Sequence, residues 1–151
     1  MHVWRLCKTR YSASVLAGEG GVHAGGRWHT RGGAVVYCAS SESLAILEVR
    51  VHLGPAIPRD RFTMHEIEIP DRLVGHLDQA ELSADWHMVP YTLTTQAIGD
   101  AWLSANRGAA LRVPSIHSRS EFNVLLNPAH PRAKDIQVLQ RRVCELDARL
   151  F

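Results

Sequence analysis

Two charged residues, Arg27 and Glu48, occupy positions where a folded chain usually avoids a charge. Arg27 lies in a turn with glycines before it, which allow a ligand to approach the backbone closely. Glu48 lies in an apolar run, and at about 100° per residue its helical stripe also carries Leu44, Leu47 and Val51. We expect this stripe to face a core, where a carboxylate costs several kcal/mol unless it is paired or hydrogen-bonded. A carboxylate placed there indicates a functional site.

Each of these residues has two interpretations. Glu48 is either a framework ion-pair partner of an arginine or a carboxylate that stabilises a developing cation or orients a sugar hydroxyl. Arg27 is either a surface arginine or an anion-binding group, since a guanidinium clamps a phosphate with two parallel hydrogen bonds. The residues alone leave both questions open.

Two further side chains are candidates for a site. Tyr37 ends a predicted strand just before the Glu48 helix, where its ring can stack on a heterocycle, although half-buried tyrosines are common in strands. Ser115 follows a strand that ends at Pro114, and its hydroxyl binds either a ligand or its own backbone. The chain has no Gly-x-Ser-x-Gly elbow, no phosphate loop and no dinucleotide fingerprint, which disfavours a classical Rossmann site.

Composition narrows the class of protein. A chain of 151 residues accommodates one domain with a full core, and a net charge of +2 does not by itself indicate nucleic acid. The sequence contains no run of 18 apolar residues, so we expect no transmembrane helix, and the first residues lack the apolar region of a signal peptide. Three widely spaced cysteines and scattered histidines predict a reducing cytoplasm and give no support for a metal site.

The elements that must position the candidates follow from periodicity and breakers. We expect strands over 2–6, 34–38, 61–69, 110–113 and 123–126, and an irregular glycine-rich loop over 18–33. One helix begins at Ser40 or Ser41 and runs to about Leu53, where Gly54-Pro55 stops it. A second is capped by Thr94 or Thr95 and ends near Gly108. Its apolar stripe is Ile98, Ala101, Trp102 and Ala105.

The segment from Asp135 alternates like a strand but also carries an apolar helical stripe, so periodicity leaves it open. The order of elements, with clustered strands and two helices between them, predicts an α+β fold.

Taken together in order, these motifs resemble the RES-domain toxins of bacterial RES–Xre toxin–antitoxin systems. The family is named for an arginine, a glutamate and a serine, which match Arg27, Glu48 and Ser115. The surrounding stretches match as well: 18–20, 25–28, 35–39, 43–49, Trp86 with Pro90, 98–103, 113–115, 121–123 and 125–131. The chain departs from the family pattern at His29, where asparagine is usual, and over 116–120, which replaces a shorter apolar-Pro-Gly stretch.

The resemblance implies a compact α+β fold like that of ADP-ribosyltransferase toxins, in which residues 1–151 form a single RES domain of small β-sheets and flanking helices. The final segment would then be a strand. Members bind NAD without a Rossmann motif, split its nicotinamide–ribose bond and pass ADP-ribose to water, phosphate or a protein. No metal is required.

Roles carry over residue by residue. Glu48 would stabilise the positive charge that develops on the ribose, Arg27 would hold the phosphates, and Tyr37 would stack on the nicotinamide. Ser115 would bond the ribose or the nicotinamide amide. Arg5 and Asn127 would lie at the rim of the pocket.

The resemblance also implies a setting. The toxin would be cytoplasmic and would form a hetero-oligomer with an Xre-type helix-turn-helix antitoxin, through which any contact with DNA would be made. No membrane is involved. The alternative function is mono-ADP-ribosylation of a host protein, and a non-catalytic anion-binding module is a more remote reading.

Overall fold

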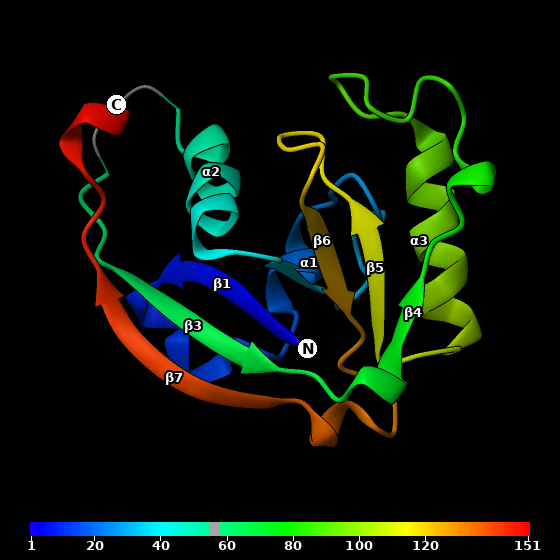
Figure 1. Cartoon of the computed structure of the whole chain (residues 1–151), viewed down its shortest axis with the longest axis horizontal. Coiled ribbons are helices and arrows are strands. Elements are labelled where there is room, and N and C mark those ends of the chain that lie inside the picture. Colours follow the sequence, from blue (N-terminus) through cyan, green and yellow to red (C-terminus); the bar gives the residue numbers. More distant parts are fainter. Residues whose placement is uncertain (55–57) are drawn as a thin grey trace.

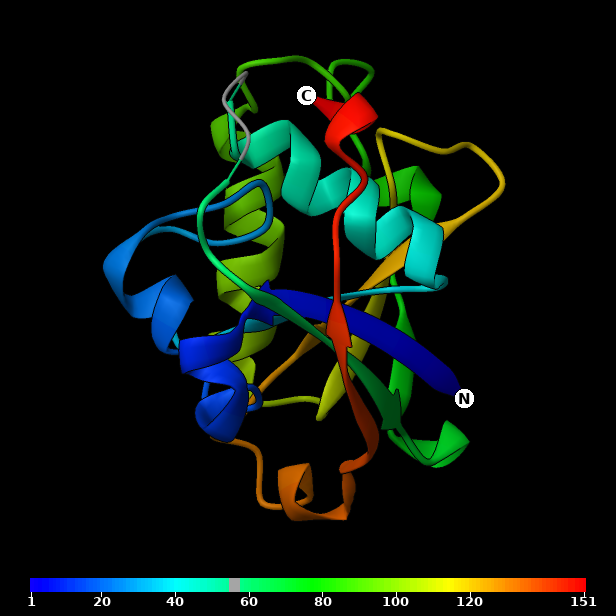
Figure 2. The ribbon, with the colours of Figure 1, turned by 90° about the vertical axis from the view of Figure 1, so that its left-hand side faces the viewer.

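A single curved sheet of seven strands organises the protein (Figures 1 and 2). The computed structural model describes residues 1–54 and 58–151, so Pro55 of the predicted helix stop lies outside the described residues. The strand order is β4-β5-β6-β2-β1-β3-β7. The strands are β1 His2–Lys8, β2 Val36–Ala39, β3 Phe62–Glu68, β4 Val74–His76, β5 Ala110–Pro114, β6 Phe122–Leu126 and β7 Gln137–Cys144.

Three α-helices accompany the sheet in the described ranges: α1 Glu19–His23, α2 Glu42–His52 and α3 Leu93–Ala105. Only β4 and β5 pair in parallel, and the other neighbours are antiparallel. The predicted α+β class is confirmed. The expectation of several small sheets is wrong, because one continuous sheet carries all seven strands.

The sheet consists of two wings that meet at one point. The first wing is β7, β3 and β1, and the second is β2, β6, β5 and β4. Between the wings, β1 and β2 share a single register pair, Trp4 with Ala39, and then diverge. The Arg5 guanidinium bridges the divergence by donating from Nη1 to the Tyr37 carbonyl at 2.6 Å. An arginine side chain thus replaces part of the missing ladder.

Helix α2 lies over the first wing and begins as predicted. The Ser41 hydroxyl accepts a hydrogen bond from the Leu44 amide at 3.1 Å, which is an N-cap. The predicted apolar stripe is wrong, however: Leu47 is 40% exposed and Val51 52% exposed. The helix packs through the side adjacent to that stripe, because the core beneath it receives Leu44, Ala45, Ile46, Val49 and Leu53. Glu48 therefore lies at the margin of the packed face, 27% exposed, and not in a core.

Helix α3 differs from its prediction at both ends and on its buried face. Thr92 is the N-cap residue, two or three residues earlier than expected, and Asn106 ends the helix in a left-handed conformation with φ of 49°. Of the predicted stripe, Ile98 and Trp102 are half-buried, whereas Ala101 and Ala105 are exposed; the fully buried residues are Thr95, Gln96 and Gly99. This face is polar and small because it packs on the backbone of the Arg27 turn, where apolar side chains would leave carbonyls unsatisfied.

The sequence did not predict three short elements, but the resemblance correctly implied a strand for the final segment. Helix α1 lies within the predicted loop 18–33, a 3₁₀ turn spans Thr9–Ser14, and β4 is a three-residue strand. Such elements are too short to show a period. The strand reading of the final segment is confirmed by β7, which pairs with β3 along its length.

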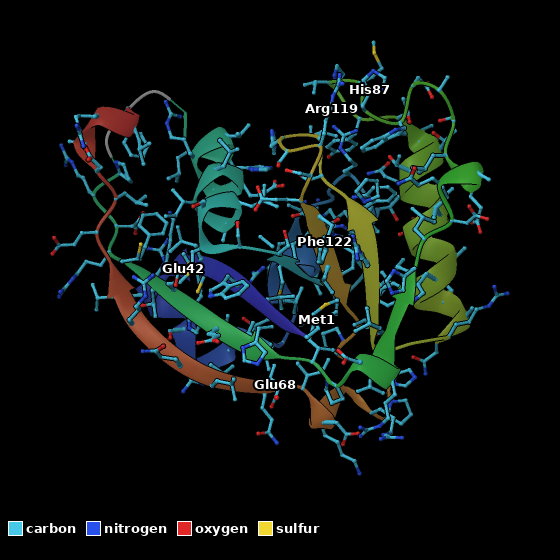
Figure 3. The ribbon with its side chains drawn as sticks, in the orientation of Figure 1. Met1, Glu42, Glu68, His87, Arg119 and Phe122 are labelled. Atoms are coloured by element: carbon cyan, nitrogen blue, oxygen red, sulfur yellow. The ribbon has the colours of Figure 1, made fainter. Side chains whose placement is uncertain are left out.

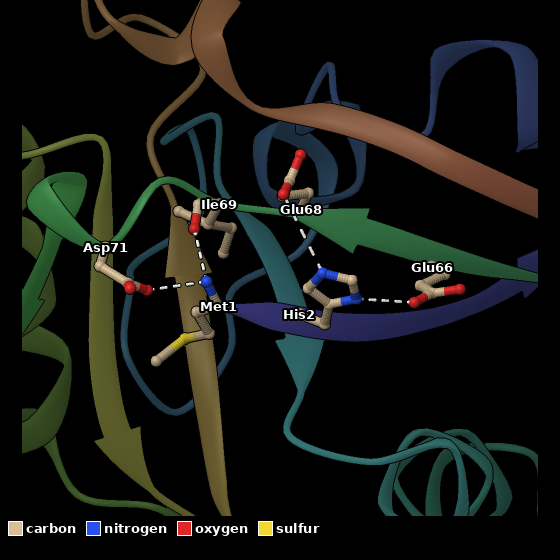
Figure 4. A network of polar contacts seen from close by, with 6 residues as sticks. All are labelled: Met1, His2, Glu66, Glu68, Ile69 and Asp71. Carbon is tan, nitrogen blue, oxygen red and sulfur yellow. Dashed lines mark hydrogen bonds and ion pairs between the residues drawn. The ribbon is translucent and has the colours of Figure 1, made fainter.

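Polar contacts fix the start of β1 against β3 (Figure 4). The Met1 amino group donates to the Ile69 carbonyl at 2.9 Å and to the Asp71 carboxylate at 2.7 Å. The His2 ring lies 2.7 Å from the Glu66 carboxylate. These contacts continue the β1–β3 ladder and hold the inner strand of the first wing in register.

Strand β3 also carries a fully buried histidine, His65. Its Nε2 lies 2.7 Å from the Ser12 hydroxyl, and its Nδ1 lies 3.3 Å from the Arg5 carbonyl. The neutral tautomer with a proton on Nδ1 satisfies both contacts. His65 thereby attaches the Thr9–Ser14 turn to the sheet.

This arrangement predicts that acid destabilises the fold. Burial lowers the pKa of His65 below its ordinary 6.5. Because the unfolded chain binds this proton more readily, the stability that neutral His65 contributes is present above pH 6.5 and is lost as the pH falls below it. We expect urea unfolding to show a lower free energy at pH 5.5 than at pH 7.5. His65→Gln should flatten this difference and the exposed His76→Gln should not; equal slopes in all three proteins would contradict the role of His65.

Candidate active site

Glu48 reaches from α2 to the ends of β5 and β6. Its Oε1 accepts a hydrogen bond from Asn123 Nδ2 at 2.7 Å and another from the Ser115 hydroxyl at 3.4 Å. Its Oε2 lies 3.5 Å from His117 Nε2. One carboxylate oxygen is thus held firmly, and the other has a loose contact and some exposure. This arrangement fixes the orientation of the carboxylate and leaves its side chain 27% exposed.

Further hydrogen bonds attach α2 to β6 and so place Glu48 beside Ser115 and Asn123. Ser40 exchanges bonds with Phe122, accepting on its hydroxyl and donating from its amide, and the Ser41 hydroxyl binds the Glu121 carboxylate. The start of α2 is therefore attached to the start of β6. Ser115 ends the β5 side, and its hydroxyl also accepts from the His117 amide at 3.1 Å. Figure 3 shows Phe122 and, on the preceding connection, Arg119.

Arg27 lies in a turn closed by a Gly26 amide that donates to the His29 carbonyl. Its guanidinium donates to the Trp86 carbonyl at 2.5 Å and to the Met88 carbonyl at 3.0 Å, which leaves three of its five N–H groups for other partners. Burial lowers the pKa of Arg27, and the nearby charge of Glu48 opposes that effect. Within the described part of the chain the two residues form no ion pair within 4.0 Å.

Helix α3 clamps the Arg27 turn from below. The Gln96 side-chain amide donates to the Gly26 carbonyl at 3.0 Å and to the His29 carbonyl at 3.1 Å. The Thr30 amide donates to the Asp100 carboxylate at 2.9 Å. Helix α3 therefore holds the turn in a fixed geometry through Gln96 and Asp100, neither of which the sequence singled out as a candidate.

Tyr37 supports the same turn from the sheet. Its hydroxyl accepts from the Trp28 amide at 3.1 Å and lies 2.8 Å from His29 Nδ1. Burial raises the pKa of Tyr37 far above the ordinary value of 10, so its hydroxyl stays neutral. Tyr37, which we expected to stack on a ligand, thus stabilises the Arg27 turn through its hydroxyl, and its side chain is half-buried.

Removing this hydroxyl should weaken the fold. Tyr37→Phe leaves the Trp28 amide without its acceptor, and an unsatisfied buried group costs about 1–3 kcal/mol. We expect a loss of that size in urea unfolding at pH 7.5. The matched variant Tyr11→Phe, at an exposed side chain, should unfold like the wild type. If the two variants are equally stable, the hydroxyl does not support the turn.

The two residues expected at the rim of the pocket, Arg5 and Asn127, lie in different parts of the structure. Arg5 lies at the seam between the wings, and its Nε is buried without a hydrogen-bond partner. Asn127 follows the opposite end of β6 from Asn123, where it binds the Asn106 side chain at 2.9 Å and accepts from the Ala129 amide. The structure therefore does not bring Asn127 to Glu48; it connects the end of β6 to Asn106, the residue that ends α3.

Sequence reasoning missed several members of this site. Asn123 and His117 contact Glu48 directly, Gln96 holds the Arg27 turn, and Trp86 stacks on Trp28 with ring centroids 6.4 Å apart. Signals existed for three of them, because Asn123 and Trp86 lie in stretches that match the family and His117 lies in the stretch 116–120 that departs from it. The other departure, His29, contacts Tyr37. Both departures therefore bear on a candidate residue.

Other hollows lie away from this cluster. One of about 220 Å³ is lined by residues between Pro58 and Phe62 and by the end of β7, and another of about 450 Å³ lies between β4, α3 and His130. Across the described residues, three or more side chains of the metal-binding kinds do not gather at one point. In the same ranges no helix has the length and apolar character needed to cross a bilayer.

Comparison with known proteins adds a family and a fold. Residues 2–147 match the family model described as "RES domain". The chain is 38% identical to a "Prs ADP-ribosylating toxin" from Sphingobium sp. (strain YBL2), covering 98% of this chain and 95% of that protein. It is 37% identical to "Toxin Res" from Photorhabdus laumondii, with 99% and 97% covered. A chain of the M. tuberculosis MbcT–MbcA toxin–antitoxin complex superposes with a TM-score of 0.76 at 21% identity, over 95% of this chain and 83% of that one.

Proposed function

The chain belongs to the RES-domain family, and we propose that it is the toxin of a toxin–antitoxin system that depletes NAD by cleaving the nicotinamide–ribose bond, with residues 1–151 forming one RES domain. The observation that carries this proposal is the separation of two opposite charges. Glu48 is held by Asn123 and Ser115 and stays 27% exposed, while Arg27, whose pKa its charge affects, binds two carbonyls. Within the described residues this carboxylate and guanidinium are not paired with each other, which suits a substrate that brings both a cation and an anion.

NAD is such a substrate. As the bond to nicotinamide breaks, positive charge develops on the ribose, and an oriented carboxylate stabilises it without reorganisation. The diphosphate offers the anion that the three free N–H groups of Arg27 bind. The bond's electron pair goes to the nicotinamide nitrogen, which leaves neutral, so no acid is needed. Glu48 has the stabilising role and Arg27 the phosphate-binding role in this proposal.

The remaining candidates fill the space between these charges. The exposed part of the Tyr37 ring would stack on the nicotinamide, and the Ser115 hydroxyl would turn from Glu48 to a ribose hydroxyl or to the amide. Arg5 stays a rim candidate because its Nε lacks a partner. Asn127 is given no contact with NAD, because its side chain is committed to Asn106 and Ala129.

The test is to incubate the purified protein with NAD, with and without phosphate, and to follow free nicotinamide. We expect nicotinamide release under at least one of these conditions. Intact NAD under all of them would overturn the proposal of NAD depletion. The products, ADP-ribose or its phosphorylated form, tell whether water or phosphate is the acceptor.

The second candidate function is transfer of ADP-ribose to a host protein. It is favoured by the name of one relative, "Prs ADP-ribosylating toxin", at 38% identity. NAD labelled in the adenosine part, incubated with host lysate, separates the two functions. A labelled protein supports transfer, and label only in small molecules supports depletion. The remote third reading, a non-catalytic anion-binding module, predicts that Glu48→Ala leaves cellular toxicity unchanged.

We also propose a cytoplasmic protein that pairs with an Xre-type helix-turn-helix antitoxin. The similar fold occurs in a toxin–antitoxin complex, which supports an antitoxin partner. Exposed apolar side chains near the Arg27 turn, Met88, Val89, Tyr91 and Leu93, suit coverage by a protein. Co-expression with the product of a neighbouring helix-turn-helix gene should yield a stable complex and relieve toxicity.

A further inference from the structure

His117 is a titratable side chain at the site that the proposed mechanism does not use. Its Nε2 lies 3.5 Å from Glu48 Oε2, which is too long for a strong hydrogen bond, so the nitrogen remains available to another partner. Its backbone amide is held by the Ser115 hydroxyl at 3.1 Å, which fixes the root of the side chain. The ring is 20% exposed and Glu48 is 27% exposed, so both side chains are partly open to solvent.

Transfer of ADP-ribose to water or to a protein hydroxyl requires a group of this kind, whereas a phosphate dianion attacks without losing a proton. When an acceptor hydroxyl attacks the ribose, its proton must leave. Glu48 must stay ionised to stabilise the ribose cation, so it cannot also keep that proton. Ser115 and Asn123, the other side chains in contact with Glu48, are not bases near neutral pH. Histidine is the side chain that ordinarily exchanges a proton in this range.

We propose that His117 is the general base for the acceptor, an inference that rests on the proposed cleavage of NAD. The C1′–N bond breaks, and its electron pair passes to the nicotinamide nitrogen. The acceptor oxygen forms the new bond to C1′, and its proton moves to Nε2 of neutral His117 and then to solvent.

Charges around His117 come from several elements. Glu48 of α2 contacts the ring, and Arg119 and Glu121 are the charged residues nearest to it along its own segment. Arg27 also interacts electrostatically with Glu48. Protonated His117 beside Glu48 would also offset the carboxylate charge that the ribose cation needs. Both effects make the neutral histidine the active form, so the rate should fall on acidification.

The experiment compares wild type, His117→Gln and the exposed control His76→Gln in NAD consumption in phosphate-free buffer, where water is the acceptor, between about pH 5 and 8. We expect His117→Gln to lower kcat by roughly 100-fold or more, to leave KM for NAD within about threefold, and to abolish the acid limb of the profile. His76→Gln should retain the wild-type values and profile. Circular dichroism and urea unfolding establish that the variants are folded.

Chemical rescue separates a lost base from a damaged site. Azide attacks as an anion and needs no proton removed, so it should raise nicotinamide release by His117→Gln at least about tenfold and affect wild type little. An unchanged kcat and pH profile in His117→Gln, or a loss that azide does not recover, would overturn the assignment. If wild type itself releases no nicotinamide with any acceptor, the proposed function fails instead, which is a distinct result.

Discussion

Glu48→Gln is expected to lower kcat for NAD consumption by about 10²–10³-fold, because the removal of one group that stabilises charge in the transition state costs about 2.7–4 kcal/mol. Glutamine keeps the shape of the side chain, and its carbonyl can still accept the Asn123 hydrogen bond. What it lacks is the negative charge that faces the ribose cation. KM should therefore change little, since the ground state gains less from that charge than the transition state does.

Kinetics of nicotinamide release, together with urea unfolding, check this expectation. Glu68→Gln makes the same chemical change at an exposed position on β3, remote from the α2 carboxylate, and should behave like wild type. A Glu48→Gln enzyme whose kcat stays within a few-fold of wild type would exclude Glu48 from catalysis and favour the non-catalytic reading.

Among substitutions that add one methyl group near the candidate site, Gly99→Ala is expected to be the most destabilising. A Cβ on Gly99 would lie 1.7 Å from the Trp28 carbonyl oxygen and 2.7 Å from the Trp28 carbonyl carbon. Both atoms are backbone, so no rotamer change relieves the clash, and α3 must move away from the Arg27 turn. Overpacking costs typically about 1–3 kcal/mol and sometimes more, and we expect a loss at or above the top of that range.

Urea unfolding measures this loss, and NAD binding should weaken with it because the Arg27 turn shifts. Gly20→Ala is the matched control: it adds the same methyl in α1, where nothing lies within 4 Å. That change should stabilise the protein by roughly 0.5–1 kcal/mol through helix propensity. Equal stability of Gly99→Ala and wild type would show that α3 and the turn are not in the close contact described above.

The sequence was informative wherever one residue decided a local structure. Ser41 begins α2 as a cap, and the strand periodicity of β3 and β6 located both strands to within a residue or so. These features depend on neighbours in the chain, which the sequence displays. The sites of Arg27, Glu48 and Ser115 were recognised for the same reason, since each stands in a distinctive local stretch.

The predictions that failed concern features that depend on contacts between residues far apart in the sequence. The stripe through Leu47 and Val51 is as apolar as the one that packs, and only the position of the first wing decides which side of α2 is buried. The argument that Glu48 enters a core was wrong for that reason. The polar face of α3 likewise has a purpose only once the Arg27 turn, about 70 residues earlier in the chain, lies against it. Asn127 looked like a site residue because its motif matched, yet antiparallel pairing places it at the far end of β6.

The single pair that joins the two wings has a consequence for synthesis. Glu48 belongs to a helix whose underlying core includes Cys144, near the end of the last strand, whereas Ser115 and Asn123 belong to the other wing. A chain emerging from the ribosome therefore holds all of its site residues before β7 exists to complete the platform under α2. The core under α2 is complete only when β7 pairs with β3, so a strand near the end of the sequence supports the helix that carries Glu48.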